Sequence, residues 1–167
     1  MFDGTLGVYL HKTFHIEVEK GSKPKHSPPY AVPNIHLETF KKELQHLVEL
    51  GVLELQCTSE WASPTFIIPK KDSRVRWISD LRELNKCIIR KEYPIPIIND
   101  ILKKRKRYAF FSKLDISMQY YTLELDDESE DLCTIVTPFG KYRYRRLPMG
   151  LKCSQDYAQE VMEKHIS

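Results

Sequence analysis

The hydrophobic positions of the chain are most regular in one early stretch, where they predict a helix. Apolar residues recur there three or four residues apart, at Leu37, Phe40, Leu44, Leu47 and Val48. This spacing gathers them on one helical face. Gly51 follows directly, and glycine is the residue most often found in the left-handed position that ends a helix. We predict a helix from about residue 37 that stops at Gly51.

Short β-rich runs separated by turn residues predict a set of strands. The runs cover residues 52–55, 65–69, 75–79, 132–137 and 141–147. Asp72 and Ser73 favour a hairpin turn between the second and third runs, and residues 138–140 favour one between the last two. Alternation of side chains over residues 109–115 and 121–125 predicts two further strands.

Two more helices and an extended lead-in complete the pattern. Pro94 and Pro96 break the chain before an amphipathic helix over about residues 97–105, and another helix follows Gly150. Residues 1–33 are rich in Gly, Pro, Lys and His and predict an extended segment. The order of elements indicates an α+β fold with an antiparallel sheet and not a βαβ winding.

Length and composition fit one domain or part of one. The chain has 167 residues, 41% hydrophobic and 29% charged, enough to bury a core but short for two domains. No apolar run approaches the roughly 18 to 20 residues of a membrane helix, and Met1 begins no signal peptide. Cys57, Cys87, Cys133 and Cys153 lack metal-ligand spacing. We expect a soluble, intracellular protein with free thiols and no membrane partner.

The charged residues come in blocks, although the net charge of +3 is too small to indicate nucleic acid by itself. Residues 103–107 form a basic run for which a solvated face is the favoured interpretation and nucleic-acid contact the alternative. In residues 141–146 basic side chains alternate with two tyrosines, so a phosphate contact there, for example by Arg143, is more plausible. Residues 124–131 carry six carboxylates and indicate a solvated acidic loop.

Asp115 stands near the end of an apolar, strand-like run, residues 110–116. A carboxylate in such a place is costly unless it is solvated, paired or bound to a cation. From these residues alone, a capping or turn aspartate and a metal ligand both remain open.

Several motifs in order resemble those of reverse transcriptases, with the gypsy-type LTR retrotransposons as the nearest match. Residues 111–116 followed by Tyr120 and Tyr121 resemble the first catalytic motif of that family. Residues 63–72 and 76–86 resemble the two fingers strands and their continuation. Residues 138–140 and 146–154 resemble the segment that positions template and nucleotide. The resemblance covers about residues 22–167. Each motif alone is a weak signal, and their order makes the signal strong.

The resemblance implies a magnesium site around Asp115. Two Mg²⁺ ions roughly 3.5 to 4 Å apart activate the primer hydroxyl and neutralise the leaving pyrophosphate, and such hard cations bind carboxylate oxygens. The family uses one aspartate of the first palm strand, the carbonyl just after it, and two aspartates of a Tyr-x-Asp-Asp hairpin. By position, Asp115 is the catalytic aspartate and a metal ligand, and the carbonyl of Ile116 is another ligand. The hairpin pair has no counterpart in this sequence.

Asp126 and Asp127 are the only adjacent aspartates, but we do not assign them to the missing pair. They lie among other acidic residues and precede the motif at residues 148–150, whereas the family's pair follows that motif. We interpret them as part of the solvated acidic loop.

The resemblance also implies nucleotide contacts. Lys70 and Arg76 flank the first hairpin and would place cationic donors on the triphosphate, with two exposed hairpin cations as the alternative. Tyr120 matches the residue whose ring excludes a 2′-hydroxyl, with a core aromatic as the alternative. Met149 and Gly150 belong to the nucleotide-facing segment, and Gly150 permits close backbone approach.

Arg82, Asn85 and Arg143 are the template–primer candidates, and a structural salt bridge or a turn is the alternative role for the first two. Three positions depart from the family pattern. This chain has Gln119 where Gly or Ala is usual. It has Met149 where Phe or Gln is common, and Gln155 where Pro is common. Met149 cannot make the hydrogen bonds that a glutamine would.

We therefore expect the fingers and a partial palm of a right-hand polymerase, α+β, truncated before the Tyr-x-Asp-Asp hairpin. The expected function is that of a fragment of an RNA-directed DNA polymerase that uses an RNA or DNA template–primer, deoxynucleoside triphosphates and Mg²⁺. The chain alone is expected to be inactive, since Asp115 is its one family carboxylate ligand. The alternative is an inactive remnant or a nucleic-acid-binding module.

The expected layout is a lead-in from a protease region over residues 1–21 and an incomplete reverse transcriptase domain over residues 22–167. Its fingers cover about residues 22–91 and 124–153, and its palm about residues 92–123 and 154–167. By resemblance, the partners include the rest of a Pol polyprotein, namely protease, RNase H and integrase. The expected location is the cytoplasm or a virus-like particle.

Overall fold

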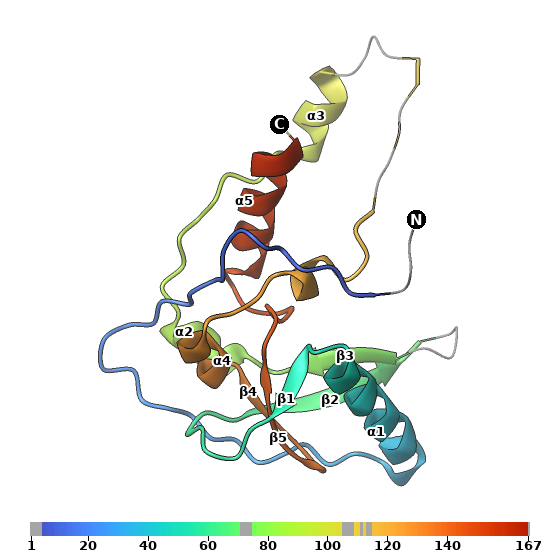
Figure 1. Ribbon diagram of the computed structural model, residues 1–167, viewed down its shortest axis with the longest axis vertical. Helices are drawn as coiled ribbons and strands as arrows, with labels where there is room; N and C mark the ends of the chain where they lie inside the picture. The colour runs from blue at the N-terminus through green and yellow to red at the C-terminus, as the bar shows by residue number, and fades with distance from the viewer. Residues whose placement is uncertain (1–4, 71–74, 105–108, 111, 113–114, 167) are drawn as a thin grey trace.

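The computed structural model describes residues 5–70, 75–104, 109–110, 112 and 115–166. Figure 1 shows a β-sheet at one end of the molecule and two helices, α3 and α5, at the other. A longer helix, α1, lies alongside the sheet. Their bounds are Asn34–Glu49 for α1, Ile98–Lys104 for α3 and Ser154–Ile166 for α5. The α+β class and all three predicted helices are confirmed.

Among the described residues, five strands form one sheet in the order β1-β5-β4-β2-β3. Their bounds are β1 Leu53–Leu55, β2 Ser63–Pro69, β3 Val75–Ser79, β4 Thr134–Thr137 and β5 Gly140–Tyr144. Both predicted hairpin pairings, β2 with β3 and β4 with β5, are present. The sheet is mixed and not wholly antiparallel as predicted, because β2 and β4 run parallel, with Ser63 opposite Ile135. Parallel strands come from distant segments, so local patterning does not reveal their direction.

Helix α1 ends as its sequence predicts. Gly51 has a φ of +68°, in the left-handed region. The Gly51 N–H donates to the carbonyl of Val48 at 3.0 Å, and the Val52 N–H donates to that of Leu47 at 2.9 Å. These two bonds form a Schellman motif, which satisfies the last carbonyls of the helix and turns the chain into β1.

Buried polar bonds between side chains join the two hairpins at the centre of the core. Trp77 of β3 donates its Nε1–H to the hydroxyl of Tyr144 of β5 at 3.0 Å. The Tyr144 hydroxyl also lies 2.8 Å from Oγ of Ser79. Burial raises the pKa of Tyr144 well above its ordinary value, so this phenol stays neutral. Phe40 of α1 covers Trp77, with 4.9 Å between ring centroids.

The N-terminal segment predicted as a lead-in shares this core. Phe14 and Ile16 are each only 1% exposed. The ring of Phe14 packs against Tyr157 of α5 at 5.0 Å between centroids, and the Tyr157 hydroxyl donates to the carbonyl of His15. Isolated bridges, and no continuous strand, tie residues 14 and 18 to Leu125 and Ile88. The packing therefore continues across the expected boundary at residue 21.

One strand prediction in the middle of the chain is wrong, and a second is tested only at its described residues. Tyr121 lies in a 3₁₀ turn, η1 (Gln119–Thr122), although the predicted alternation does bury it together with Leu123 and Leu125. Alternation over so few residues shows which side chains are buried, but it does not distinguish a strand from a short turn followed by the isolated bridges at residues 124 and 125. Of the predicted strand 109–115, the described residues are not in a strand, and Phe110 is 92% exposed. Its Phe111, Lys113 and Leu114 lie outside the described residues.

Two short helices were not predicted. One is α2 (Arg82–Cys87), and the other is α4 (Asp127–Leu132). The prediction of a solvated acidic loop over residues 124–131 is wrong, because Asp126 caps α4 by accepting the Ser129 N–H at 3.0 Å. Within the described part of the chain, no helix is long and apolar enough to cross a membrane. The four cysteines are free, as expected.

The left-handed conformation of Gly51 leads to a stability prediction. Gly51→Ala should lower the free energy of unfolding by about 1 to 2 kcal/mol, because a Cβ disfavours positive φ. Gly51→Asn should cost less, since asparagine tolerates this region. Urea unfolding followed by circular dichroism measures both, with Lys41→Ala on the exposed face of α1 as a control within about 0.5 kcal/mol of wild type. Equal unfolding midpoints for Gly51→Ala and wild type would contradict the assignment.

Candidate nucleotide and template site

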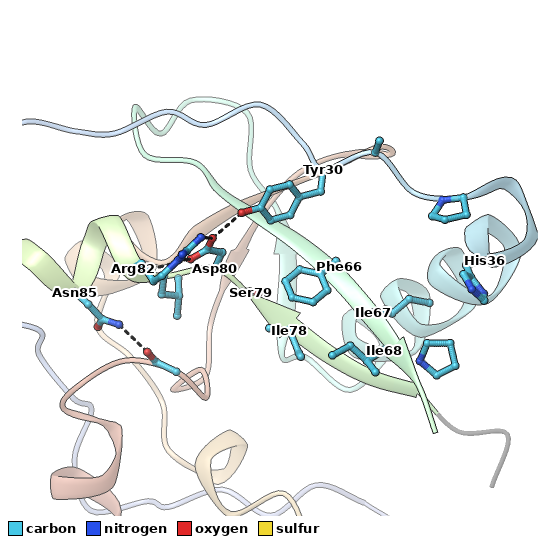
Figure 2. Close-up of a pocket in the computed structure, with 15 residues that line it drawn as sticks. Tyr30, His36, Phe66, Ile67, Ile68, Ile78, Ser79, Asp80, Arg82 and Asn85 are labelled. Carbon is cyan, nitrogen blue, oxygen red and sulfur yellow. Dashed lines mark hydrogen bonds and ion pairs between the residues drawn. The ribbon is translucent and has the colours of Figure 1, made fainter. Parts of the chain in front are cut away.

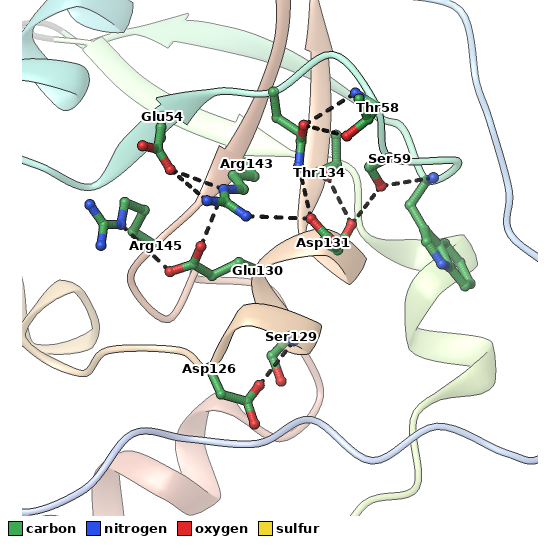
Figure 3. A network of polar contacts seen from close by, with 12 residues as sticks. Glu54, Thr58, Ser59, Asp126, Ser129, Glu130, Asp131, Thr134, Arg143 and Arg145 are labelled. Atoms are coloured by element: carbon green, nitrogen blue, oxygen red, sulfur yellow. Dashed lines mark hydrogen bonds and ion pairs between the residues drawn. The ribbon is translucent and has the colours of Figure 1, made fainter.

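Arg143 of β5 and Arg145 just after it pair with carboxylates of α4 and β1 (Figure 3). Arg143 of β5 lies 2.8 Å from a carboxylate oxygen of Glu54, 3.2 Å from one of Glu130 and 3.5 Å from one of Asp131. Arg145 also lies 3.6 Å from Glu130. Burial raises the pKa of Glu130, and the two arginines oppose that shift. The guanidinium of Arg143, a predicted template–primer contact, is thus already shared among three carboxylates.

All five predicted nucleotide-binding residues line one pocket of about 650 Å³. Lys70 directly follows β2 and Arg76 lies in β3, Tyr120 comes from η1, and Met149 and Gly150 come from the loop before α5. Segments about 80 residues apart in sequence therefore meet at this pocket. The pocket is also lined by buried Trp77, which forms part of its apolar wall.

Asp115 and Ile116 lie in the segment just before η1. Ile116 lines the 650 Å³ pocket, and Asp115 directly precedes it and is exposed to solvent. Met118, between them and Tyr120, has a φ of +54°, which is uncommon for a residue other than glycine, asparagine or aspartate. Ile116, this left-handed Met118 and Tyr120 all line the same pocket.

A second pocket, of about 840 Å³, is lined by the template candidates Arg82 and Asn85 (Figure 2). Asp80 orients Arg82, because its two carboxylate oxygens accept from Nη2 at 2.6 Å and from Nε at 2.8 Å. The hydroxyl of Tyr30 donates to the same carboxylate at 2.6 Å. The Arg82 guanidinium and the Tyr30 hydroxyl hold the pKa of Asp80 well below its usual range. The cluster is thus an ionised carboxylate between two donors.

Asn85 uses both ends of its amide within the protein. Its Nδ2 donates to the carbonyl of Gly150 at 2.8 Å, and its Oδ1 accepts the backbone N–H of Lys152 at 2.9 Å. These bonds connect α2 to the loop that carries Met149 and Gly150. The two pockets also meet here, since Ile78, Ser79 and Gly150 line both of them.

Sequence analysis missed Tyr30 and Asp80 as site residues. Tyr30 lies in a Pro-rich stretch 50 residues before Asp80, and its ring packs edge-on against Phe66 of β2 at 5.8 Å. A tyrosine between prolines was a weak signal of a binding surface. Asp80 lies within the motif that was recognised, two residues before Arg82, and that short spacing could have suggested the pair.

The family is identified by comparison with known proteins. The model of the family described as "Reverse transcriptase (RNA-dependent DNA polymerase)" matches residues 68–167, which is more than half of the chain. This chain belongs to the reverse transcriptase family. The match includes β3, η1, the β4–β5 hairpin and α5, and thus most of the nucleotide pocket.

Curated relatives include retrotransposon polyproteins. The chain is 32% identical over 149 residues to the "Retrovirus-related Pol polyprotein from transposon 412" of Drosophila melanogaster, which covers 86% of the chain and 12% of the polyprotein. It is 25% identical over 145 residues to the Tf2-7 polyprotein of Schizosaccharomyces pombe, covering 82% of the chain and 11% of that polyprotein. The chain thus spans about an eighth of their length. The gypsy type is consistent with these relatives, whose descriptions do not name it.

Solved structures share the fold. A protease–reverse transcriptase of prototype foamy virus matches 97% of the chain and 22% of its own length, with a TM-score of 0.82 and 22% identity. Another foamy virus protease–reverse transcriptase, solved in complex with an RNA/DNA hybrid, matches with a TM-score of 0.79 and 18% identity. At this identity the likeness shows the fold alone, and it confirms the expected reverse transcriptase architecture.

The Tyr30–Asp80–Arg82 cluster predicts a pH-dependent contribution to stability. The folded-state pKa of Asp80 is depressed, so its contribution is present above the ordinary aspartate pKa of about 3.9 and is lost as pH falls below it. Asp80→Asn should lower the free energy of unfolding by about 1 kcal/mol at pH 7. Urea unfolding of both proteins should give a smaller difference at about pH 2.5. A difference that is the same at both pH values would argue against the ionised cluster.

Proposed function

We propose that this chain binds an incoming deoxynucleoside triphosphate and a template–primer, as the fingers and part of the palm of an RNA-directed DNA polymerase. The observation that carries the proposal is the convergence of Lys70, Arg76, Tyr120, Met149 and Gly150 on one pocket. These residues come from three separate segments, and the pocket of about 650 Å³ lies within the range for small-molecule sites.

The chemistry of the pocket suits a nucleotide. Lys70 and Arg76 are exposed cations at its rim, where they can donate to phosphate oxygens. Tyr120 is partly buried at the wall and offers a ring face for a sugar. Trp77 and Met149 provide apolar surface, so the triphosphate end of the ligand is directed to the cationic rim.

A divalent cation fits this arrangement in part. Reverse transcriptases are generally metal-dependent, and Mg²⁺ prefers carboxylate and carbonyl oxygens. Asp115 would supply one carboxylate and Ile116 its backbone carbonyl, while among the described residues no group of three His, Cys, Asp or Glu could hold a metal ion. When bound, Mg²⁺ would supply charge neutralisation at the triphosphate. Lys70 and Arg76 would provide the protein's own positive charge at the triphosphate. Asp115→Asn should leave the contribution of these two cations unchanged.

The template would run along the pocket lined by Arg82 and Asn85. This assignment is supported by the shared lining, because Ile78, Ser79 and Gly150 separate it from the nucleotide pocket by a single layer of residues. A template base and an incoming base could pair across that boundary. Arg143 would join the template–primer contacts only by giving up one of its three carboxylates.

The wider assignments also belong to this proposal. The lead-in, fingers and palm divisions, the gypsy-type origin and the cytoplasmic or particle location follow the resemblance. The relatives are Pol polyproteins, and by likeness to them we propose that protease, RNase H and integrase are partners of this chain. Catalysis would need further carboxylates beside Asp115. A binding module without catalysis is the alternative, because the cationic rim and the template pocket need no metal ligand.

The nucleotide assignment predicts that removing both rim cations weakens nucleotide binding. Lys70→Ala with Arg76→Ala should raise the Kd for a fluorescent dATP analogue at least about tenfold, since each removes a hydrogen bond to a charged group. Fluorescence anisotropy with a template–primer ending in a dideoxynucleotide measures it. Lys41→Ala with Lys42→Ala removes two exposed cations outside the pocket and is the matched control. Equal affinity of the two double variants would refute the site.

Template–primer binding should depend on salt and on Arg82. Affinity should fall as salt rises, because phosphate contacts release counterions. Arg82→Gln should weaken binding and reduce the slope of log K against log salt by about one. Lys103→Gln, in the basic run interpreted as solvated, should leave slope and affinity unchanged. An Arg82→Gln slope equal to wild type would remove Arg82 from the interface, and a reduced slope for Lys103→Gln would favour nucleic-acid contact by residues 103–107.

A further inference from the structure

We propose that Asn85 is a positioning residue. Its amide holds the Gly150 backbone at the boundary between the nucleotide pocket and the template pocket, and it acts on the nucleotide through that backbone instead of contacting the template. This inference rests on the proposed function and changes the role that the resemblance implied for Asn85.

The bonds of Asn85 leave little of its amide for a ligand. Nδ2 donates to the Gly150 carbonyl at 2.8 Å and Oδ1 accepts from the Lys152 N–H at 2.9 Å, so both ends of the amide are engaged by one loop. The Asn85 backbone is itself fixed, since its N–H donates to the Leu81 carbonyl at 2.8 Å, and the neighbouring Leu84 is fully buried. A template contact by this amide would compete with the loop.

The loop is anchored on both sides of the point that Asn85 holds. Ser154 donates its hydroxyl to the Pro148 carbonyl at 2.7 Å, in a buried bond. Leu151 and Cys153 are buried in the core. Met149 and Gly150 between these anchors are exposed. Asn85 therefore bonds the exposed tip of an otherwise anchored loop.

Gly150 is the residue through which this bond can reach both ligands, because it lines both pockets. Its φ of +101° is open to glycine and disfavoured for other residues. A Cβ there would stand 3.9 Å from the Ser79 carbonyl, an ordinary contact, so the backbone conformation and not lack of space requires glycine. Holding such a flexible residue takes an external bond, and Asn85 supplies it.

The side chain next to Gly150 makes the backbone more important. Met149 is 50% exposed at the nucleotide pocket, and its thioether is at most a weak acceptor and not a donor. The strong polar groups on this part of the wall are therefore backbone N–H and carbonyl groups. Their position relative to a nucleotide depends on the Asn85 bonds, so loosening them should weaken nucleotide binding even with the template in place.

The test separates the two ligands. Asn85→Ala removes both bonds, and Asn85→Asp keeps the acceptor for the Lys152 N–H while placing a second oxygen against the Gly150 carbonyl. Each variant should raise the Kd for the dATP analogue about fivefold or more at saturating template–primer, and should change the template–primer Kd measured without nucleotide by less than about twofold. Lys86→Gln is the control, because Lys86 lies on α2, is exposed and pairs with Glu83. It should change neither constant.

Three results would overturn the proposal. Weaker template–primer binding with unchanged nucleotide affinity would mean that Asn85 contacts the template, and no change in either constant would mean that the bonds do not matter. Thermal melting shows whether each variant folds. If Asn85→Ala does not fold, the nucleotide and template–primer affinities of Asn85→Asp test the proposal. Amide hydrogen exchange of wild type is independent of both, since a Lys152 N–H that exchanges without protection would also overturn the proposal.

Failure of the proposed function would look different. If wild type binds no nucleotide, or if Lys70→Ala with Arg76→Ala binds it normally, the nucleotide site is wrong while the Lys152 amide stays protected. If those measurements give the expected results and only the Asn85 variants leave the nucleotide Kd unchanged, the positioning role alone is wrong.

Discussion

Charge compensation between α4 and β5 is the interaction on which the rest of the structure depends. Glu130 is only 4% exposed, and a carboxylate so buried is costly without cationic partners. Arg143 of β5 and Arg145, which directly follows β5, provide them, and β5 lies between β1 and β4. Tyr144, which lies between these two arginines and is buried, bonds Trp77 and Ser79 of β3. Neutralising Glu130 thus keeps β5 in the position from which it joins the two hairpins.

This pairing also explains which parts of the molecule local sequence patterns could predict. The Leu37 to Val48 periodicity and Gly51 are signals within one segment, and α1 ends where they indicated. The acidic and basic blocks were each recognised but interpreted separately, one as a solvated loop and the other as a phosphate contact. The paired arginines and carboxylates are 12 to 22 residues apart in sequence, or 89 for Arg143 and Glu54, and no periodicity links them. The parallel pairing of β2 and β4 was hidden for the same reason.

The candidate site, too, could be predicted from the sequence only in part. Motif order placed Lys70, Arg76, Tyr120, Met149 and Gly150 together before the structure gathered them in one pocket. It did not reveal that Asp80 and Tyr30 hold Arg82, or that Asn85 holds Gly150. Motifs record which residue types recur, whereas the division of labour between residues that face a ligand and residues that hold them depends on hydrogen bonds across the fold. From the sequence alone, Arg82 and Asn85 were interpreted as ligand contacts, whereas the structure shows that each is bonded to a partner within the protein.

The burial of Phe14 and Ile16 has a consequence for how the chain can be divided. Phe14 packs on Tyr157, and the Ile16 N–H donates to Oγ of Ser129 at 2.7 Å inside the protein. A polypeptide started at residue 22 would lack both side chains, leaving a hole beside α5 and an unpaired hydroxyl on α4. The packed core therefore includes Phe14 and Ile16, which lie upstream of the region matched by motifs.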